Sequence, residues 1–285
     1  MRNPENFEPE DEAKEVEEAE EKIKEEEPQT FEIGEKKEND IEGLETFIGE
    51  VAEKLKKEGV PVDDDCRIDM DAFKDVYPSE SVEGNKKTVE EFENKWYGNL
   101  SKSEIKQEKL KKEGEQLEML VTSIFNKFLG SEFITVRSAP YDDIRNKVDN
   151  LILEKETGNI VCAFDDVGDS SGYRFAEKER KILERNRKGT SIRYGLNIKE
   201  GELALEPREN IPIFCLALSG ENIRDGIKKS ELSFEKKSDF EKKLFDYFVS
   251  TLNSQIKKLK LEGNLNWKIK EQLNSFEEVI KKFDK

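Results

Sequence analysis

The stretch 148-VDNLILEKETGNIVCAFDDV-167 decides the fold of this chain, because it holds two apolar segments separated by a short polar turn. Short runs rich in Val, Ile and Leu between turn residues are typical of β-strands. A favoured three-residue hairpin loop ends with a residue of positive φ, and Gly158 stands at that position in 156-ETG-158. The stretch therefore predicts an antiparallel β-hairpin.

An aspartate stands at the open end of each strand of this hairpin. The turn sets the pairing of opposite residues: Leu153 with Val161, Leu151 with Ala163, and Asp149 with Asp165. Opposite Cβ atoms in an antiparallel pair lie about 5 Å apart, so the two carboxylates repel each other unless a cation lies between them. Hard divalent cations such as Mg²⁺ take carboxylate oxygens as ligands. The hairpin therefore predicts a metal site, and the alternative is that both aspartates are solvated at exposed strand ends.

The negative charge of the chain is concentrated in one segment. Hydrophobic residues make up 34% of the sequence and charged residues 40%, so part of the chain is expected to lie outside any packed core. Residues 1–50 contain 20 Asp and Glu against 6 Lys and Arg, and so account for −14 of the net charge of −17. The remaining chain is close to neutral, and its charge does not exclude a nucleic acid partner.

The residue types that are missing exclude several classes of chemistry. The chain has no histidine, which excludes His-based catalytic triads and the usual His-containing zinc sites. Its cysteines, Cys66, Cys162 and Cys215, form no CxxC motif, as expected for reduced thiols. The first residues lack the apolar core of a signal peptide, and no run approaches the ~18 apolar residues of a membrane span. We therefore expect a soluble, cytoplasmic protein without membrane contact.

Composition divides the chain into three parts. Residues 1–43 lack aliphatic periodicity, which predicts a disordered acidic tail. Residues 44–102 begin with an amphipathic helix and continue as a loop-rich extension with short helices, and residues 103–285 carry the dense apolar pattern of a folded domain. The elements predicted in this domain are helix 104–130 capped by Gly130, strand 133–138, the hairpin, helix 175–188, a second hairpin at 191–205, strand 211–219, a helix that starts at a Ser238 cap, and a last helix around 269–283. This order predicts an α/β domain with a mixed β-sheet flanked by α-helices.

The order of these elements carries a family resemblance. The domain has a helix with a glutamate, a strand, a strand that starts with Asp, and a strand that ends with acidic residues, namely 114-GEQLE-118, strand 133–138, 148-VD-149 and 163-AFDDV-167. This resembles the core of the restriction-endonuclease-like, or PD-(D/E)xK, nuclease superfamily over about residues 104–220. The resemblance implies that Glu118, Asp149 and Asp165 bind one or two Mg²⁺ or Mn²⁺ ions, with Asp166 as the alternative to Asp165. In that family the ions polarise the scissile phosphate and activate a water molecule for hydrolysis.

Helix geometry favours Glu118 over Glu115 as the acid of the 104–130 helix. At about 100° per residue, Glu118 lies beside Phe125 at the border of the apolar face, whereas Glu115 falls towards solvent. From the border of the apolar face a carboxylate is able to reach the edge of the sheet.

The lysine of the family motif is replaced in this chain. Val167 stands two positions after Asp165, where the family has Lys. The next helix offers Arg174, Lys178 and Lys181 on one face, and Lys178 is the expected replacement. With seven Lys and Arg against three Glu over 174–188, this helix is also expected to contact phosphates, and the alternative is an ordinary solvated helix face.

Two functions follow from these patterns. The first is a divergent Mg²⁺-dependent nuclease that hydrolyses phosphodiester bonds in DNA, or in RNA. The second is a catalytically inactive protein of the same fold whose acidic tail binds a protein partner, since the family lysine is missing. The segment 140-PYDDIRN-146 is expected to be a loop beside the site, with Asp142 and Asp143 as the next candidate acids.

Overall fold

The computed structural model describes residues 36–158, 160–167, 172–262 and 264–283. Its centre is a four-stranded sheet in the order β1-β2-β3-β6, in which β1, β2 and β3 are antiparallel neighbours and β6 runs parallel to β3. The strands are β1 (Phe133–Arg137), β2 (Asn150–Glu154), β3 (Ile160–Val167) and β6 (Ile213–Ala217). A separate antiparallel ribbon is formed by β4 (Thr190–Lys199) and β5 (Glu202–Ile211). The mixed α/β fold expected from the sequence is therefore confirmed.

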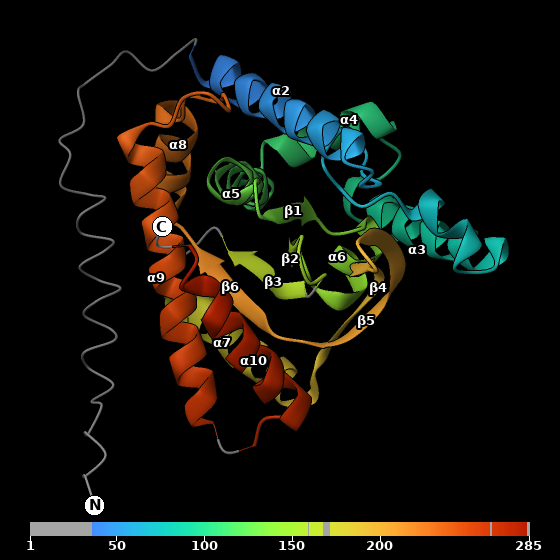
Figure 1. The fold of residues 1–285 in the computed structure, drawn as a ribbon. Coiled ribbons are helices and arrows are strands. Elements are labelled where there is room, and N and C mark those ends of the chain that lie inside the picture. The colour runs from blue at the N-terminus through green and yellow to red at the C-terminus, as the bar shows by residue number, and fades with distance from the viewer. Residues whose placement is uncertain (1–35, 159, 168–171, 263, 284–285) are drawn as a thin grey trace, which may run out of the picture.

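Helices surround this sheet (Figure 1). They are α2 (Lys36–Lys57), the 3₁₀ helix η1 (Met70–Asp75), α3 (Ser79–Tyr97), α4 (Lys102–Leu110), α5 (Glu113–Leu129), α6 (Pro140–Asn146), α7 (Gly172–Lys188), α8 (Gly220–Lys229), α9 (Asp239–Leu261) and α10 (Trp267–Ile280). α5 lies across the sheet, with α2 packed on it. α9 runs beside β6, where the side-chain amide of Gln255 bonds the N–H of Cys215 (2.9 Å) and its carbonyl (2.7 Å). These bonds satisfy backbone groups at the edge of the sheet.

α5 joins the sheet to the outer helices. Phe125 of α5 stacks on Phe164 of β3, with ring centroids 5.5 Å apart. Lys127 forms a fully buried ion pair with Glu241 of α9. Glu241 also accepts the N–H of Ser238 (2.7 Å) in the capping box that starts α9, so the predicted Ser238 cap is confirmed. These contacts fix α5 relative to both the sheet and α9.

The turn of the predicted hairpin is present and requires glycine for two reasons. Gly158 has a φ of 69°, a conformation that costs free energy for any residue with a β-carbon. A β-carbon at this position would also lie 2.2 Å from the backbone nitrogen of Ile198 in β4. The hairpin turn therefore packs directly against the β4–β5 ribbon.

The register of β2 on β3 agrees with the prediction at the open end of the hairpin and differs near the turn. The observed pairs are Asn150 with Phe164, Leu151 with Ala163, Ile152 with Cys162, and Leu153 with Ile160. The predicted pairing of Leu153 with Val161 is wrong, because a β-bulge places one extra residue in β3. Beyond the bulge the predicted register holds, up to the positions next to Asp149 and Asp165.

The helix predicted at 104–130 is two helices. α4 and α5 meet at Lys111 and Lys112, and the side chain of Gln116 donates to the carbonyl of Leu110 (2.8 Å) across the break. The predicted cap Gly130 ends α5, where its N–H donates to the carbonyl of Asn126. Glu115 and Glu118 therefore lie in the first two turns of a new helix, α5.

The N-terminal region is more helical than predicted. α2 begins at Lys36 and not at Leu44, and the segment predicted to be loop-rich contains the 19-residue helix α3. The apolar residues that α3 buries are Val82 and Val89, so its sequence lacks the apolar stripe by which helices are recognised. The disorder predicted for the tail up to residue 35 lies outside the described residues. Within the described part, no helix is long and apolar enough to cross a membrane.

Candidate functional site

Glu118 lies on α5 where the helix approaches the start of β2. The side-chain amide of Asn150 donates to Thr122 Oγ1 (2.6 Å) and to the backbone carbonyl of Glu118 (3.4 Å). The Glu118 carboxylate accepts from Nη2 of Arg137 (2.7 Å), at the end of β1, and from Nη2 of Arg67 (2.9 Å). Glu118 therefore reaches the sheet, and its carboxylate is paired with two guanidinium groups.

Arg67 reaches Glu118 from a segment far away in the sequence. Residues 63–69 lie along β1, because the N–H of Arg137 donates to the carbonyl of Cys66 (2.9 Å) and the N–H of Ile68 donates to the carbonyl of Arg137 (3.0 Å). The side chains of Arg67 and Arg137 are 9% and 1% exposed. Two buried cations at one place need carboxylates beside them, since an unpaired buried charge is strongly unfavourable.

Glu115 and Asp143 supply the other carboxylates of this cluster. We predicted that Glu115 points towards solvent, and this is wrong: its side chain is 15% exposed, pairs with Arg137 and lies 3.5 Å from Nη2 of Arg67. Helix geometry misses this contact because residues 63–69 cover that side of α5. Asp143 of α6 accepts from Nη1 of Arg67 (3.2 Å). Arg67, Arg137, Glu115, Glu118 and Asp143 thus form one buried charge cluster with a formal charge of −1.

Burial and charge have opposite effects on the carboxyl groups of the buried charge cluster. Burial favours the neutral form of Glu115, but the charges of Arg137 and Arg67 outweigh it and lower its pKa to about 2. Burial raises the pKa of Glu118 despite the same two arginines, and the negative charges of Asp143 and Glu115 add to this. With three acids and two cations, the cluster therefore favours the charged form of Glu115 more than that of Glu118.

The buried charge cluster borders a cavity of about 770 Å³. Residues of η1, α3, α4 and α5 line this cavity, including Trp96, Tyr97 and Lys112. Lys112 donates to the Tyr97 hydroxyl (2.6 Å), and Nε of Arg137 is buried without a hydrogen-bond partner in the described part of the chain. The lining contains eight acidic and seven basic side chains. This near balance of charge indicates no preference for a strongly anionic or cationic ligand.

Asp149 and Asp165 lie at the same end of neighbouring strands. Asp149 directly precedes β2, is 8% exposed, and donates its N–H to the carbonyl of Phe164 (2.8 Å). Asp165 follows Phe164 on β3, where its backbone pairs with Cys215 of β6. The side chains of Asp165 and of its alternative, Asp166, lie outside those that the structure describes. The backbone therefore places Asp149 and Asp165 at the same end of neighbouring strands, and the observed pairs of β2 with β3 begin at Asn150 with Phe164.

The expected metal ligands differ in how well they suit a divalent cation. Carboxylate oxygens such as those of Asp149 are the ligands that Mg²⁺ prefers. The surroundings of Glu118 suit such an ion poorly, because two guanidinium groups next to its carboxylate would repel it. Over residues 36–158, 160–167, 172–262 and 264–283, no group of three or more Cys, Asp or Glu side chains is placed to hold a metal ion.

The basic residues predicted on one face of α7 are partly described. Lys178 is half-buried, and Lys181 forms an ion pair with Glu177 (2.8 Å). The side chain of Arg174 lies outside the described ones. α7 contacts β6 beside the strand that carries Asp165.

Arg185 of α7 is a residue that sequence reasoning did not single out. Its Nη1 donates to the carbonyl of Lys147 (2.8 Å), two residues before Asp149. The sequence signal that could have identified Arg185 is its position seven residues after Lys178, which places both side chains on the same helix face. Arg185 therefore ties the basic helix to the segment that leads into β2.

The segment 140–146 forms helix α6 and not the expected loop. Asp142 is fully buried and accepts the N–H groups of Arg193 (2.8 Å) and Tyr194 (2.9 Å) in β4. Burial raises the pKa of Asp142, and these N–H groups partly oppose the effect. Asp142 thus anchors the β4–β5 ribbon, whereas Asp143 belongs to the buried charge cluster.

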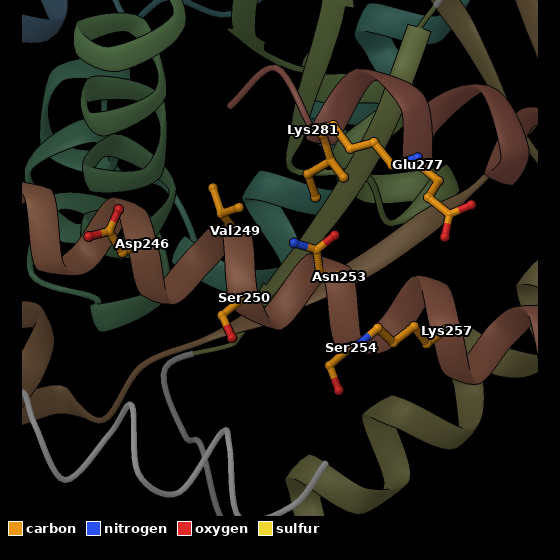
Figure 2. Close-up of a pocket in the computed structure, with 9 residues that line it drawn as sticks. Asp246, Val249, Ser250, Asn253, Ser254, Lys257, Glu277 and Lys281 are labelled. Atoms are coloured by element: carbon orange, nitrogen blue, oxygen red, sulfur yellow. The ribbon is translucent and has the colours of Figure 1, made fainter. Parts of the chain in front are cut away.

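A second cavity, of about 490 Å³, lies between α9 and α10. Figure 2 shows the side chains that line it: Asp246, Val249, Ser250, Asn253, Ser254 and Lys257 of α9, with Glu277 and Lys281. The polar residues of α9 recur at helical spacing and form one face. Acidic and basic groups are balanced here, so this groove resembles a polar surface more than a catalytic centre.

No family model matches the chain, and the searches of curated proteins and of solved structures find no match either.

Proposed function

We propose that the chain is a divergent nuclease of the PD-(D/E)xK type that hydrolyses phosphodiester bonds in DNA with Mg²⁺ or Mn²⁺. The observation that supports this best is the order α5, β1, β2, β3, in which the register of β2 on β3 brings Asp149 and Asp165 to one end of neighbouring strands. This is the order of elements from which the sequence resemblance was inferred. The proposal therefore depends on the register of β2 on β3 and on the carboxylate chemistry of these two aspartates.

Each acid has a separate role in this proposal. Asp149 and Asp165, or Asp166 in place of Asp165, would hold the ion. A bound ion would polarise the scissile phosphate and activate a water molecule for hydrolysis. Glu118 is the third acid of the family set, and in the structure its carboxylate is paired with the two arginines of the buried charge cluster.

Lys178 takes the place of the missing family lysine and contacts the phosphate. The attachment of α7 to Lys147 through Arg185 supports this role, because it holds the basic helix next to the residues that precede Asp149. Lys and Arg side chains on this helix also neutralise backbone phosphates without reading sequence.

A second candidate function is an inactive protein of the same fold that binds a partner through its acidic tail. The specific observation in its favour is the pairing of Glu118 with Arg67 and Arg137, which removes one of the three acids from the site. The valine at position 167, where the family has lysine, also favours an inactive protein.

Incubation of the purified chain with plasmid and with single-stranded DNA tests the proposal. We expect cleavage with Mg²⁺ or Mn²⁺, no cleavage with chelator, and no cleavage by Asp149→Asn, because an amide is a poorer ligand for a hard cation than a carboxylate. Asp225→Asn is the matched control, since Asp225 lies on α8 and pairs with Lys229 at the surface (3.0 Å). This control should cleave as the wild type does.

Two outcomes would contradict the proposal. Intact DNA after incubation of the folded wild type with either ion would favour the inactive partner-binding protein. Equal cleavage by Asp149→Asn and by the wild type would remove Asp149 from the site.

A further inference from the structure

The turn between α9 and α10 exposes two large apolar side chains. Leu261, the last residue of α9, is 78% exposed, and Trp267, the first residue of α10, is 67% exposed. The backbone at Trp267 is held in place, because Asn266 accepts the N–H of Lys268 (2.9 Å) as the cap of α10 and its amide bonds Asn210 of β5 (3.0 Å). An exposed aromatic side chain on a backbone that is held in place is suited to form a contact surface.

The ends of α9 and α10 on either side of this turn are basic, in a chain that is strongly acidic. Residues 257–270 contain five lysines and one glutamate, a charge of +4 against −17 for the whole chain. The glutamate, Glu262, is paired with Arg187 of α7 (2.8 Å). Among the described residues, no carboxylate lies within 4.0 Å of the ammonium groups of Lys268 or Lys270. We call Leu261, Trp267, Lys268 and Lys270 the Trp267 platform.

The end of α9, which carries Leu261 of the Trp267 platform, is joined to α7. Two ion pairs join α7 to the end of α9: Arg187 with Glu262, and Lys258 with Glu179 (3.9 Å). α7 carries a charge of +4 of its own over residues 174–188. Lys257, the first lysine of residues 257–270, also lines the polar groove of Figure 2. α7 and the platform are therefore joined through the end of α9.

We propose that the Trp267 platform binds single-stranded nucleic acid, with a base stacked on Trp267 and flanking phosphates on Lys268 and Lys270. The choice of nucleic acid as the partner rests on the proposed nuclease function. The ammonium of Lys268 lies 5.8 Å from the centre of the Trp267 ring, so a base on the ring would bring its phosphate close to this cation. Stacking needs bases that are free of a duplex, which selects single strands.

The chemistry of the platform favours nucleic acid over an anionic lipid surface. Membrane-bound segments bury a continuous apolar face in the lipid. Here the exposed apolar side chains of the turn, among the residues that the structure describes, are two, and Asn266 between them caps α10 and bonds Asn210. The single flat ring of Trp267 suits one stacked base, and the two lysines beside it suit the phosphates on either side of that base.

Fluorescence anisotropy of a labelled oligothymidine with the full chain tests this inference, in chelator so that binding is measured without cleavage. We expect the wild type to bind at low salt, and Trp267→Ala to bind about 10-fold more weakly, as expected for one lost base stack. Leu100→Ala is the control, because Leu100 is also an exposed apolar side chain (38%) but lies between α3 and α4. This control should bind as the wild type does.

Two further measurements locate the contacts. The chain has two tryptophans, so Trp96→Phe leaves Trp267 as the only one, and its emission should fall when the oligonucleotide is added. Lys268→Gln with Lys270→Gln should make the salt dependence of binding less steep by roughly 1.4 in the slope of log K against log salt, since each phosphate contact on a single strand contributes about 0.7.

The inference is overturned if the wild type does not bind the oligonucleotide, or if Trp267→Ala and Leu100→Ala bind equally well. It is also overturned if the chain sediments with phosphatidylserine vesicles but ignores the oligonucleotide. Because chelator is present, these results do not depend on catalysis. Binding as expected without any cleavage in the Mg²⁺ assay would contradict the nuclease alone, and cleavage without an effect of Trp267→Ala would contradict the platform alone.

Discussion

Nη2 of Arg137, at the end of β1, lies 2.7 Å from the carboxylate of Glu118 on α5, in a place where the arginine side chain is 1% exposed. This pair belongs to the buried charge cluster, so its removal leaves carboxylates without a counter-charge. Breaking a buried ion pair by removing one partner costs about 3–5 kcal/mol. The cluster therefore makes definite predictions about stability.

Arg137→Met should lower the free energy of unfolding by about 3–5 kcal/mol, because Glu115 and Glu118 then share the single charge of Arg67. Arg180→Met is the control: Arg180 is 62% exposed and pairs with Glu184, so its loss should cost at most about 1 kcal/mol. Adding Glu118→Gln to Arg137→Met should recover part of the loss. Urea unfolding measures all three, and similar costs for Arg137→Met and the control would refute a buried cluster.

The stability of the chain should fall in acid because of Glu115. Its folded-state pKa of about 2 lies below the usual value of 4.5, so its stabilisation is complete above pH 4.5 and is lost as the pH falls through about 2. Between pH 5 and pH 2, the free energy of unfolding should therefore fall by roughly 3 kcal/mol less in Glu115→Gln than in the wild type. Glu278→Gln, at a side chain that is 72% exposed, should follow the wild type. Parallel pH curves for wild type and Glu115→Gln would contradict this prediction.

The hairpin turn gives a matched pair of glycine substitutions. Gly158 and Gly201 both have positive φ, 69° and 83°, but a β-carbon meets the backbone of Ile198 at Gly158 and open space at Gly201. Gly201→Ala should cost about 1–2 kcal/mol for the left-handed conformation. Gly158→Ala should cost at least about 2 kcal/mol more, since the β4–β5 ribbon must also move. Thermal unfolding of the two variants should show this difference, and equal melting temperatures would mean that the turn does not pack on the ribbon.

Mg²⁺ should raise the melting temperature of the wild type if Asp149 and Asp165 hold it, because an ion that binds the folded state alone stabilises that state by mass action. Asp149→Asn should remove this response together with any cleavage. Lys178→Ala should weaken cleavage but keep the thermal response, since lysine is proposed to act on the phosphate and not on the ion. A wild-type melting curve that millimolar Mg²⁺ and Mn²⁺ leave unchanged would argue against the metal site.

The sequence by itself determined the features that depend on neighbours a few residues apart. The turn at Gly158, the capping box at Ser238 and the pairing of Leu151 with Ala163 all follow from local chemistry, and each is present. Turn type and strand alternation act over short distances, so their signals lie together in the chain. They also placed Asp149 and Asp165 at one end of the hairpin.

Only the tertiary structure decided the surroundings of Glu115 and Glu118. Arg67 lies 51 residues before Glu118 in the sequence, and its contact arises because residues 63–69 pair with the backbone of β1. No periodicity marks such a contact, since closing a long loop depends on the packing of the whole domain and not on local preference. The same reason explains why helix geometry directed Glu115 to solvent, whereas the folded chain buries it against two arginines.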